Sequence, residues 1–407
     1  MAPREVTPPD SPKAWKPHTL IVEHPRDDET LSLIGISRFQ PRDDIKNILI
    51  TGGAGFIGSW VTRHLTVQYP EYNIVCFDKL DRVASLANIS CLKPFPNFSF
   101  VQGDIASSDA MSHALATHNI DCVMHFAASS HVQNSFDDAA SFTHNNVVGT
   151  QVLLDCVRHH GRVKRFVHVS TDEVYGETNG EFLNETHQFL PTNPYSASKA
   201  AAEMYVHAYS KSFDIPVIIV RSNNVYGPCQ YPEKIIPKFF SLLSSQKPLT
   251  IQGSGLNSRR YLYGADAADA FDMVLHKGEV REAYNVGSAF EITNLEVAVR
   301  MLQLFGYSPQ ADFAKRLYWI EDRPFNDYDY RVDGSKLQAL GWRQQTSFED
   351  GLAATVEWYR KNMYIWWPSE TELGSEDVVS GKKTGLKQVD SAISMSVVEV
   401  APSHSLV

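Results

Sequence analysis

The chain has 407 residues, of which 43% are hydrophobic and 21% charged, a composition typical of a globular protein with a sizeable core. Its formal net charge of −10 leaves no large cationic field for nucleic acid or anionic lipid, so any bound phosphate needs a local site. Five scattered cysteines without a CxxC pair argue against a disulfide framework and against zinc. No apolar run reaches the roughly 18 residues that span a bilayer, and no apolar signal sequence opens the chain, so we expect a cytoplasmic protein without membrane contacts.

The chain divides into four parts by composition. Residues 1–45 combine repeated prolines with mixed charge, and we expect a disordered N-terminal extension there. Residues 46–227 alternate short apolar runs with helix-length segments and form the main domain. Residues 228–367 contain more proline and aromatics, which indicates a smaller C-terminal substrate-binding lobe whose chain crosses back to the main domain. Residues 368–407 are expected to form a flexible tail, and docking of either tail on the body is the alternative.

Six apolar runs predict the strands of one sheet. Each run is continuously apolar rather than alternating, as expected when helices cover both faces of a parallel sheet. Segments such as 139–160 and 195–213 have the length and composition of crossover helices. The predicted fold class is therefore α/β, a doubly wound parallel sheet of Rossmann-like type. The runs are NILITGG (47–53), NIVCFD (73–78), FSFVQGD (98–104), CVMHFAA (122–128), RFVHVST (165–171) and PVIIVRS (216–222).

The first predicted strand leads directly into a turn that contains Gly52, Gly55 and Gly58, and a helical segment follows. Glycine at a strand-to-helix junction permits a tight turn and lets a pyrophosphate approach the N-terminus of the helix. The GxxGxxG spacing resembles the pattern of short-chain dehydrogenases/reductases. Asp78 ends the second predicted strand, where a carboxylate accepts the ribose hydroxyls of NAD and repels the 2′-phosphate of NADP. These residues predict an NAD site.

Two further positions near this site allow more than one interpretation. Lys79 follows Asp78 directly, so binding of NADP stays open beside binding of NAD. Asp104 and Ile105 end the third predicted strand, where they can meet the adenine. The alternative is an ordinary strand-to-helix turn in which Asp104 caps the helix.

A tyrosine and a lysine open one of the predicted helices. Tyr195 and Lys199 have the spacing i, i+4, which places the phenol and the ammonium on one helix face. A tyrosine titrates at about pH 10, and a neighbouring ammonium favours its phenolate. The pair therefore predicts a base that removes a hydroxyl proton while hydride leaves the same carbon.

Thr171, Asp172 and Glu173 end a predicted strand at the carboxyl edge of the sheet, where ligands of α/β proteins bind. Thr171 can hydrogen-bond the reacting hydroxyl. Two adjacent acids suit a step that removes a carbon-bound proton and expels a hydroxyl, because that step needs a base and an acid together. The alternative is that Asp172 and Glu173 merely cap the following turn.

Taken together, these motifs resemble the extended short-chain dehydrogenases/reductases, and specifically the nucleotide-sugar 4,6-dehydratases. The resemblance spans roughly 46–365 and is closest to the UDP-glucose 4,6-dehydratases of UDP-rhamnose synthesis, because RPFND differs from the RPGHD-like segment of the dTDP-glucose enzymes. The segments that carry it are TGGAGFIG (51–58), HFAASSHV (125–132), STDEVYG (170–176), NPYSASK (193–199), NNVYGP (223–228), YPEKIIP (231–237), Arg259 with YLY (261–263), and RPFND (323–327).

The resemblance implies a hydro-lyase that uses a recycling NAD to convert UDP-glucose to UDP-4-keto-6-deoxyglucose. Tyr195 would take the O4 proton while hydride leaves C4, with Thr171 positioning O4. Glu173 would remove the C5 proton while Asp172 protonates the departing 6-hydroxyl, and hydride would return to C6. Lys199 would lower the pKa of Tyr195 and bind the nicotinamide ribose.

The resemblance also implies where the two ligands lie. A homodimer built on helices within 139–160 and 195–213 is implied too, and a downstream epimerase or reductase is a candidate partner. No metal is expected. The expected NAD contacts are Gly52, Gly55, Phe56, Ile57, Gly58, Asp78, Lys79, Asp104, Ile105, Phe126, Ala127, Ala128, Tyr195 and Lys199. The expected substrate contacts are Ser130, Thr171, Asn224, Lys234, Arg259, Asn294 and Arg323.

Two departures from the pattern and several alternatives stay open. Ser129 stands where families of this type often carry Glu or Gln, and Ala265 replaces an acidic residue. We interpret His125 as a strand histidine with its hydrogen bonds satisfied rather than as a metal ligand. The rival enzymes are a dTDP-glucose 4,6-dehydratase, a UDP-hexose 4-epimerase and a UDP-glucuronate decarboxylase, and the last two do not need the pair of acids. From a different class, the alternative is a catalytically silent NAD-binding sensor.

Overall fold

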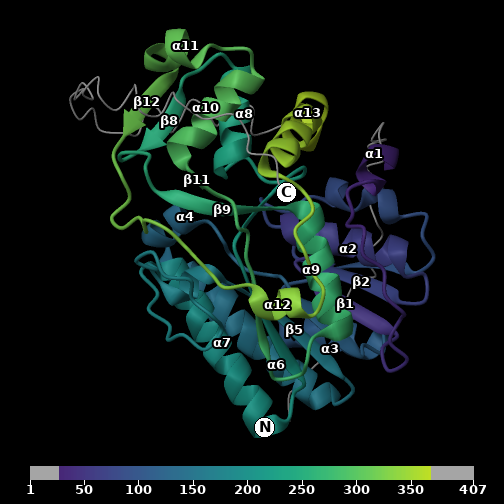
Figure 1. The fold of residues 1–407 in the computed structure, drawn as a ribbon. Coiled ribbons are helices and arrows are strands. Elements are labelled where there is room, and N and C mark those ends of the chain that lie inside the picture. The colour runs from purple at the N-terminus through teal and green to yellow at the C-terminus, as the bar shows by residue number, and fades with distance from the viewer. Residues whose placement is uncertain (1–26, 368–407) are drawn as a thin grey trace, which may run out of the picture.

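The computed structural model describes residues 27–367, so residues 1–26 and the tail predicted at 368–407 lie outside the described residues. A seven-stranded sheet forms the centre (Figure 1), all of its strands are parallel, and their order is β10-β6-β5-β4-β1-β2-β3. The predicted fold class is confirmed. The strands are β1 (Asn47–Thr51), β2 (Asn73–Asp78), β3 (Phe98–Gln102), β4 (Cys122–His125), β5 (Arg165–Thr171), β6 (Val217–Ser222) and β10 (Ala283–Val286).

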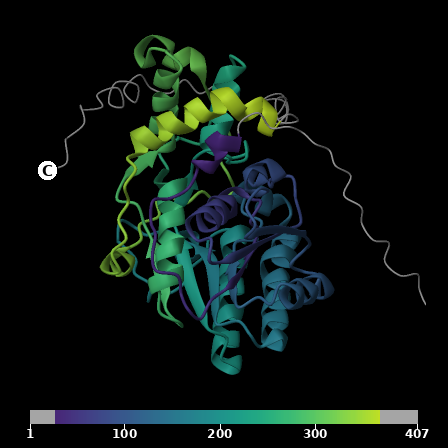
Figure 2. The same ribbon diagram turned by 90° about the vertical axis from the view of Figure 1, so that its right-hand side faces the viewer.

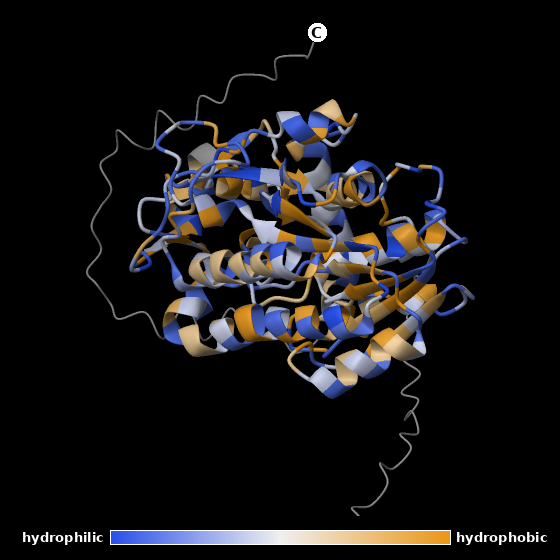
Figure 3. Cartoon of the chain, turned by 90° about the horizontal axis from the view of Figure 1, so that it is seen from below, coloured by the Kyte–Doolittle hydropathy of each residue, from blue (hydrophilic) through white to orange (hydrophobic). Residues whose placement is uncertain are grey.

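Alternate side chains of the central strands enter two separate hydrophobic clusters. Ile48 and Ile50 of β1 pack into the cluster on one face of the sheet, and Leu49 packs into the cluster on the other face. Helices cover both faces of the sheet, and each helix carries both hydrophobic and hydrophilic residues (Figure 3). Because both faces of the strands are covered, the strands are continuous apolar runs in the sequence. The helices are α2 (Phe56–Gln68) and α9 (Gly264–Lys277) on one face, and α3 (Ser108–Thr117), α6 (Gly149–His160) and α7 (Pro194–Phe213) on the other.

The segment predicted as one crossover helix over 139–160 is interrupted. A π-helical stretch, η3 (Thr143–Val148), separates the short α5 (Ala139–Phe142) from α6, and another short helix, α4 (Val132–Asp137), precedes them. Thr150 Oγ1 donates a hydrogen bond to Asn146 O at 2.6 Å, within this widened part of the helix. Such π-turns often occur at functional sites.

The chain after β6 forms a smaller lobe and also returns to the sheet. β10 pairs with β6 as the last strand of the main sheet, and α9 packs on α2. Neither the long α13 nor any other helix within residues 27–367 is long and apolar enough to cross a membrane. The elements of the lobe are β7 (Asn224–Tyr226), α8 (Ile235–Ser244), β8 (Leu249–Gln252), β9 (Ser258–Tyr263), β11 (Glu291–Thr293), α10 (Asn294–Leu304), α11 (Pro309–Arg316), β12 (Leu317–Ile320), α12 (Ser335–Ala339) and α13 (Phe348–Trp366).

Residues 27–45, here called the N-terminal arm, pack on the body. The arm begins with α1 (Asp27–Leu31), which lies beside α13 (Figure 2), and it buries Leu33 and Ile45 in the main core. Its backbone N–H groups and Ser37 bind side chains of α2, of α9 and of the turn before β2. The prediction of a disordered extension up to residue 45 therefore needs correction over 27–45, because the partners of the arm are distant in sequence.

Candidate active site

The predicted site residues gather at the carboxyl edge of the central sheet. Gly52 follows β1, Phe126 follows β4, Thr171 ends β5 and Asn224 lies two residues after the end of β6. Neighbouring parallel strands end at the same edge, so residues far apart in sequence meet there. The edge divides into a glycine turn, a group of acids beside Tyr195, and a group of cations from the smaller lobe.

The glycine turn between β1 and α2 has no room for side chains at Gly52, Gly53 and Gly58. Gly52 has a φ of +70°, and a Cβ on it would lie 2.6 Å from the backbone nitrogen of Ala127. A Cβ on Gly58 would collide with the carbonyl oxygen of Gly52. Gly55 is the N-cap of α2, so Phe56 and Ile57 form the first turn of that helix. Glycine therefore lets this turn pack tightly between β1 and α2, and the turn leads into the N-terminus of a helix, where a pyrophosphate can bind.

Asp78, the last residue of β2, lies directly beside this turn. Its carboxylate accepts hydrogen bonds from Ala54 N at 3.0 Å and from Leu80 N at 2.8 Å. Burial raises the pKa of Asp78, against the backbone N–H groups that favour its charged form. Lys79 Nζ lies 3.7 Å from the carboxylates of both Asp81 and Asp104. Because these acids engage Lys79, this end of the site is unfavourable for a 2′-phosphate.

The remaining predicted cofactor contacts border the turn. Asp104 accepts a hydrogen bond from Ala106 N at 2.9 Å, while Ser107 is the N-cap of α3, so Asp104 stabilises the turn without capping the helix. Ile105 is buried and lies against Gly149 of α6. Phe126, Ala127 and Ala128 follow β4, and the backbone nitrogen of Phe126 donates to Thr51 O at 3.0 Å.

Asp172 is a buried carboxyl with two side-chain partners. Its Oδ1 accepts a hydrogen bond from Thr171 Oγ1 at 3.1 Å, and its Oδ2 accepts one from Asn223 Nδ2 at 2.5 Å. Burial, and then the charge of Glu173, raise the pKa of Asp172 to about 7. A carboxyl that titrates near neutrality can donate a proton at the pH of the cell.

Glu173 is held by a different set of partners. Its Oε2 accepts hydrogen bonds from Asn193 Nδ2 at 3.2 Å and from the Tyr330 hydroxyl at 3.4 Å. Burial raises the pKa of Glu173, while the positive charge of Arg259 opposes that rise. A carboxylate with a raised pKa is a stronger base, and its partners differ from those of Asp172, so the two acids can take different roles.

Tyr195 and Lys199 lie at the start of α7, but they do not pair as the sequence analysis expects. The Tyr195 hydroxyl is hydrogen-bonded to Thr171, and burial together with the charge of Glu173 raises the pKa of Tyr195. Lys199 Nζ donates to Val169 O at 2.7 Å, and burial lowers the pKa of Lys199 to about 8. The ammonium of Lys199 is thus bound to the strand backbone, and the pKa of Tyr195 is raised first by burial and then by the charge of Glu173.

The start of α7 is fixed by its cap and by a buried ion pair. Asn193 and Ser196 form a reciprocal capping box at the N-terminus of the helix, and Pro194 occupies its first position. Further along, the buried carboxylate of Glu203 binds the guanidinium of Arg221 on β6, with Nε at 3.0 Å from Oε1. The capping box therefore fixes where the helix begins, just before Tyr195, and the ion pair anchors the helix to the sheet beyond Tyr195.

Three predicted cations and Glu173 act on one another electrostatically. Lys234 precedes α8 and donates to Ser130 O at 2.9 Å. Burial lowers the pKa of Lys234, with Glu173 and Arg323 among the neighbouring charges. Burial, and next the charge of Arg259, lower the pKa of Arg323. Two guanidiniums and an ammonium thus lie near Glu173, and the ammonium of Lys234 also lies 3.9 Å from the carboxylate of Glu233. In a chain of net negative charge, such a local group of cations is suited to binding phosphate.

The other predicted substrate residues take more peripheral places. Ser130 is exposed, and it contacts Lys234 only through its carbonyl oxygen in the interactions above. Asn224 is partly buried in β7, where it pairs with Tyr261. Asn294 is the first residue of α10 and donates its backbone N–H to Asn257 O at 3.1 Å. No interaction described here joins the Asn294 side chain to the catalytic acids.

The two departures from the family pattern have structural partners. Ser129 is bound through both backbone groups by the side chain of Asn146, at 2.7 Å and 2.9 Å, and its Oγ accepts a hydrogen bond from Asn145. Ala265 packs against the main core. His125 has hydrogen-bonding partners on both ring nitrogens, the hydroxyls of Thr51 and Thr150, which agrees with a satisfied strand histidine.

Sequence reasoning missed several side chains that position the acids. Asn193 and Asn223 lie inside segments already recognised, NPYSASK and NNVYGP, so the signal was present without an assigned role. Tyr330 and Asp327 hydrogen-bond each other, and Asp327 also accepts from Thr192 Oγ1 at 2.7 Å. Nothing in the spacing around Tyr330 indicates that it reaches Glu173.

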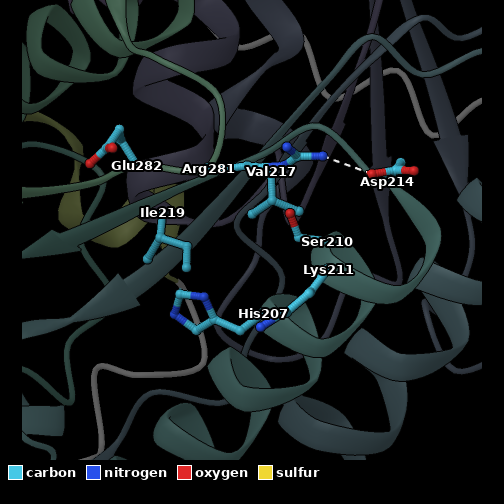
Figure 4. A pocket seen from close by; sticks show the side chains of 8 residues that line it. All are labelled: His207, Ser210, Lys211, Asp214, Val217, Ile219, Arg281 and Glu282. Atoms are coloured by element: carbon cyan, nitrogen blue, oxygen red, sulfur yellow. Dashed lines mark hydrogen bonds and ion pairs between the residues drawn. The ribbon is translucent and has the colours of Figure 1, made fainter.

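A separate hollow of about 460 Å³ lies at the opposite edge of the sheet (Figure 4). Val217, the first residue of β6, lines it together with His207 and Lys211 of α7 and with Arg281 before β10. The catalytic acids follow the carboxyl end of β5, whereas this hollow borders the amino end of β6. It is therefore not part of the candidate active site.

Sequence relatives agree with this geometry. The profile of the family described as GDP-mannose 4,6 dehydratase matches residues 49–355. The trifunctional UDP-glucose 4,6-dehydratase/UDP-4-keto-6-deoxy-D-glucose 3,5-epimerase/UDP-4-keto-L-rhamnose-reductase of Arabidopsis thaliana is 52% identical over 79% of this chain and 48% of its own length. This chain therefore spans about half the length of the curated plant relatives it matches. The dTDP-D-glucose 4,6-dehydratase of Bos taurus is 43% identical over 82% of this chain and 94% of its own length.

Solved structures agree as well. The dTDP-glucose 4,6-dehydratase of Streptomyces venezuelae, crystallised with NAD bound, is 38% identical and superposes with a TM-score of 0.75. The match covers 79% of this chain and 99% of that chain. The family match, the relatives and the shared fold confirm the resemblance carried by the motifs: the chain belongs to the nucleotide-sugar 4,6-dehydratase family described as GDP-mannose 4,6 dehydratase, whose members are hydro-lyases.

Proposed function

We propose that this protein is an NAD-dependent UDP-glucose 4,6-dehydratase that forms UDP-4-keto-6-deoxyglucose, on the way to UDP-rhamnose. The observation that carries the proposal is the adjacent pair of acids beside Tyr195, the buried Asp172 and the partly buried Glu173. UDP-glucose is favoured over dTDP-glucose because the plant relative named for UDP-glucose is 52% identical, against 43% for the bovine dTDP-glucose enzyme.

The glycine turn fits NAD on a local observation, since it packs tightly at Gly52 and Gly58 and leads directly into the N-terminus of α2, with the carboxylate of Asp78 bound beside it. The first turn of α2 would hold the pyrophosphate, and Asp78 the adenosine ribose. When bound, NAD supplies a positively charged ring that accepts hydride from C4 of the sugar and later returns it to C6.

Tyr195 would remove the proton of the O4 hydroxyl, and Thr171 would orient that hydroxyl. The raised pKa of Tyr195 means that the buried phenol is neutral among the acids alone. A positive charge next to it lowers that pKa, so phenolate formation is expected only in the complex with the oxidised cofactor. Lys199 adds a second positive charge, one helical turn further along α7.

The elimination of water needs a base at C5 and an acid at O6. A keto group at C4 acidifies the C5 proton, which Glu173 would remove, and Asp172 would protonate the departing hydroxyl. The pKa of about 7 for Asp172 leaves a protonated fraction at neutral pH. Since Lys234, Arg259 and Arg323 lie by Glu173, they would bind the diphosphate and bring the hexose to these acids.

The experiment is to incubate purified protein and NAD separately with UDP-glucose and dTDP-glucose. We expect a 4-keto product from UDP-glucose that has lost one water, detected by mass and by absorbance in alkali, without net NADH. Preferred turnover of dTDP-glucose would indicate a dTDP-glucose 4,6-dehydratase. A product of unchanged mass would indicate an epimerase, and binding of NAD without turnover would indicate a sensor. A third incubation with UDP-glucuronate tests the decarboxylase, which would release carbon dioxide from it.

We also propose a homodimer that uses the outer face of α6 and α7. Met204, Tyr205 and Phe213 of α7 and Val148 before α6 are apolar side chains exposed by 40–50%. Burial of such a face against a second copy removes apolar surface from water. Tyr205→Glu should give a monomer by light scattering, whereas Tyr318→Glu, an exposed tyrosine of the lobe, should not.

An epimerase and a reductase would act next on the product.

A further inference from the structure

The glycine turn is hydrogen-bonded by the side chain of Asn88, which belongs to no cofactor motif. Ala54, within the turn, is fully buried, and its carbonyl oxygen accepts hydrogen bonds from Asn88 Nδ2 at 2.8 Å and from Ser85 N at 3.1 Å. Its own N–H donates to Asp78 Oδ2 at 3.0 Å. The last residue of β2 and the chain that follows it therefore fix both peptide groups of Ala54, immediately before Gly55 and α2.

Asn88 also connects this turn to both ends of the described chain, to α13 directly and to the N-terminal arm through Arg63. Asn88 is completely buried, and its Oδ1 accepts a hydrogen bond at 2.8 Å from Nε1 of Trp366, the last residue of α13. Its backbone carbonyl accepts one from Arg63 Nη1 at 2.5 Å, and Arg63 Nε donates to Leu33 O of the N-terminal arm at 3.0 Å. Trp366 and Leu33 both lie outside the family match at 49–355.

The partners of Asn88 decide which way its amide points. The two ends of an asparagine amide have nearly the same shape, so the hydrogen-bond network fixes the orientation. The indole N–H of Trp366 is only a donor, so it must face Oδ1, and this turns Nδ2 toward Ala54 O. A flipped amide would place oxygen against oxygen and leave a buried carbonyl with one hydrogen bond fewer.

We propose that Trp366 and Asn88 are positioning residues for NAD. The C-terminal helix orients the Asn88 amide, which fixes the peptide before Gly55 where the pyrophosphate approaches α2. This inference rests on the proposed NAD site and adds to it a control of affinity by α13. Because coupling between two sites is reciprocal, docking of α13 strengthens NAD binding, and bound NAD strengthens the docking of α13.

The test compares two neighbouring tryptophans. Trp366→Phe keeps an aromatic ring and removes the N–H that faces Asn88. Trp367→Phe makes the same change at a residue that is equally buried and whose Nε1 has no hydrogen-bond partner within residues 27–367. Calorimetry on protein stripped of NAD should give a dissociation constant for NAD about 10-fold higher for Trp366→Phe, the scale of one buried hydrogen bond, and within about twofold of the parent for Trp367→Phe.

A second variant separates positioning from general loss of structure. Asn88→Asp still accepts from Trp366 but presents oxygen to Ala54 O, so it should weaken NAD binding at least as much as Trp366→Phe. Combining Trp366→Phe with Asn88→Asp should weaken NAD binding no further, because both changes act on the same series of hydrogen bonds from Trp366 through Asn88 to Ala54. The affinity for UDP, measured on the same samples, should stay unchanged in each variant.

The outcomes are distinct. Trp366→Phe with the NAD affinity of Trp367→Phe would overturn the inference, and so would equal losses of NAD and UDP affinity in a folded Trp366→Phe protein. If Trp366→Phe does not fold, Asn88→Asp decides on the same readouts. A parent protein that binds no NAD would instead refute the proposed cofactor site itself.

Discussion

At the scale of single residues, two adjacent carboxyls differ because their partners differ. Asp172 is bound by Thr171 and Asn223, whereas Glu173 is bound by Asn193 and Tyr330. An amide donor stabilises the charged form of each acid, and burial outweighs it in both, so both pKa values are raised. The proposed division into one acid and one base thus rests on partners of which Asn223, Asn193 and Tyr330 lie far from these acids in the sequence.

The role of Asp172 predicts a pH dependence. The pKa of Asp172 in the folded protein is raised to about 7, so its proton is present below that pH and lost above it. We therefore expect kcat to fall as the pH rises through about 7. Asp172→Asn should lower kcat by about 10²- to 10⁴-fold, the usual size of general acid catalysis, and should remove this alkaline limb. An unchanged alkaline limb in Asp172→Asn would assign the ionisation to another group.

The role of Glu173 predicts a trapped intermediate. Glu173→Gln cannot remove the C5 proton, but the steps at O4 and C4 do not need this carboxylate. We expect the variant to oxidise the sugar once and then stop, so that NADH accumulates in an amount equal to the enzyme and is visible by its absorbance. Glu177→Gln, a nearby exposed acid, is the control and should turn over normally. Full turnover by Glu173→Gln would contradict the assignment.

At the scale of elements, the start of α7 combines a structural and a chemical task in one residue. The Asn193 side chain caps the helix through Ser196 N at 2.9 Å and donates to Glu173 Oε2 at 3.2 Å. Because serine caps helices about as well as asparagine but cannot reach as far, the two tasks can be separated by substitution.

Asn193→Ser and Asn193→Ala should therefore differ in stability. Loss of the cap in Asn193→Ala should lower the free energy of unfolding by about 1 kcal/mol, whereas Asn193→Ser should unfold close to the parent in urea. Both variants lose the bond to Glu173, so both should show reduced kcat with little change in KM for the UDP-sugar. Normal kcat in Asn193→Ser would remove Asn193 from the positioning of Glu173.

The same scale shows what the sequence could predict. The six apolar runs correspond to six strands of the sheet. Both faces of these strands are buried, so consecutive residues are apolar and the strands can be recognised in the sequence. The seventh strand, β10, has only four residues and depends on pairing with β6. The π-helical η3 could not be read from periodicity, because the contacts of Asn146 with Ser129 and Ser198 are tertiary.

At the scale of the whole molecule, the N-terminal arm shows the limit of reading local composition. Its proline and charge indicate disorder, yet its polar groups meet a buried acid on α9. Asp272 Oδ2 accepts hydrogen bonds from Ser37 Oγ at 2.7 Å and from the Tyr69 hydroxyl at 2.8 Å. His64 Nε2 and His276 Nδ1 lie 3.1 Å and 2.8 Å from the same carboxylate. The arm, α2 and α9 are therefore joined at one fully buried carboxylate.

This cluster predicts how the stability of the protein responds to acid. Burial alone would raise the pKa of Asp272, but hydrogen bonds from His276 and His64 outweigh it and lower the pKa to about 2, below its ordinary value of 3.8. A folded-state pKa below the unfolded one stabilises the protein above pH 4 by about 2 kcal/mol, and this contribution is lost as the pH falls from about 4 to about 2. In urea unfolding, Asp272→Asn should be less stable than the parent at neutral pH, and the difference should shrink over that interval. Asp214→Asn, which changes an exposed acid, is the control, and its free energy of unfolding should follow that of the parent at every pH. A constant difference in the free energy of unfolding between Asp272→Asn and the parent would show that packing alone, not ionisation, joins the arm to α9.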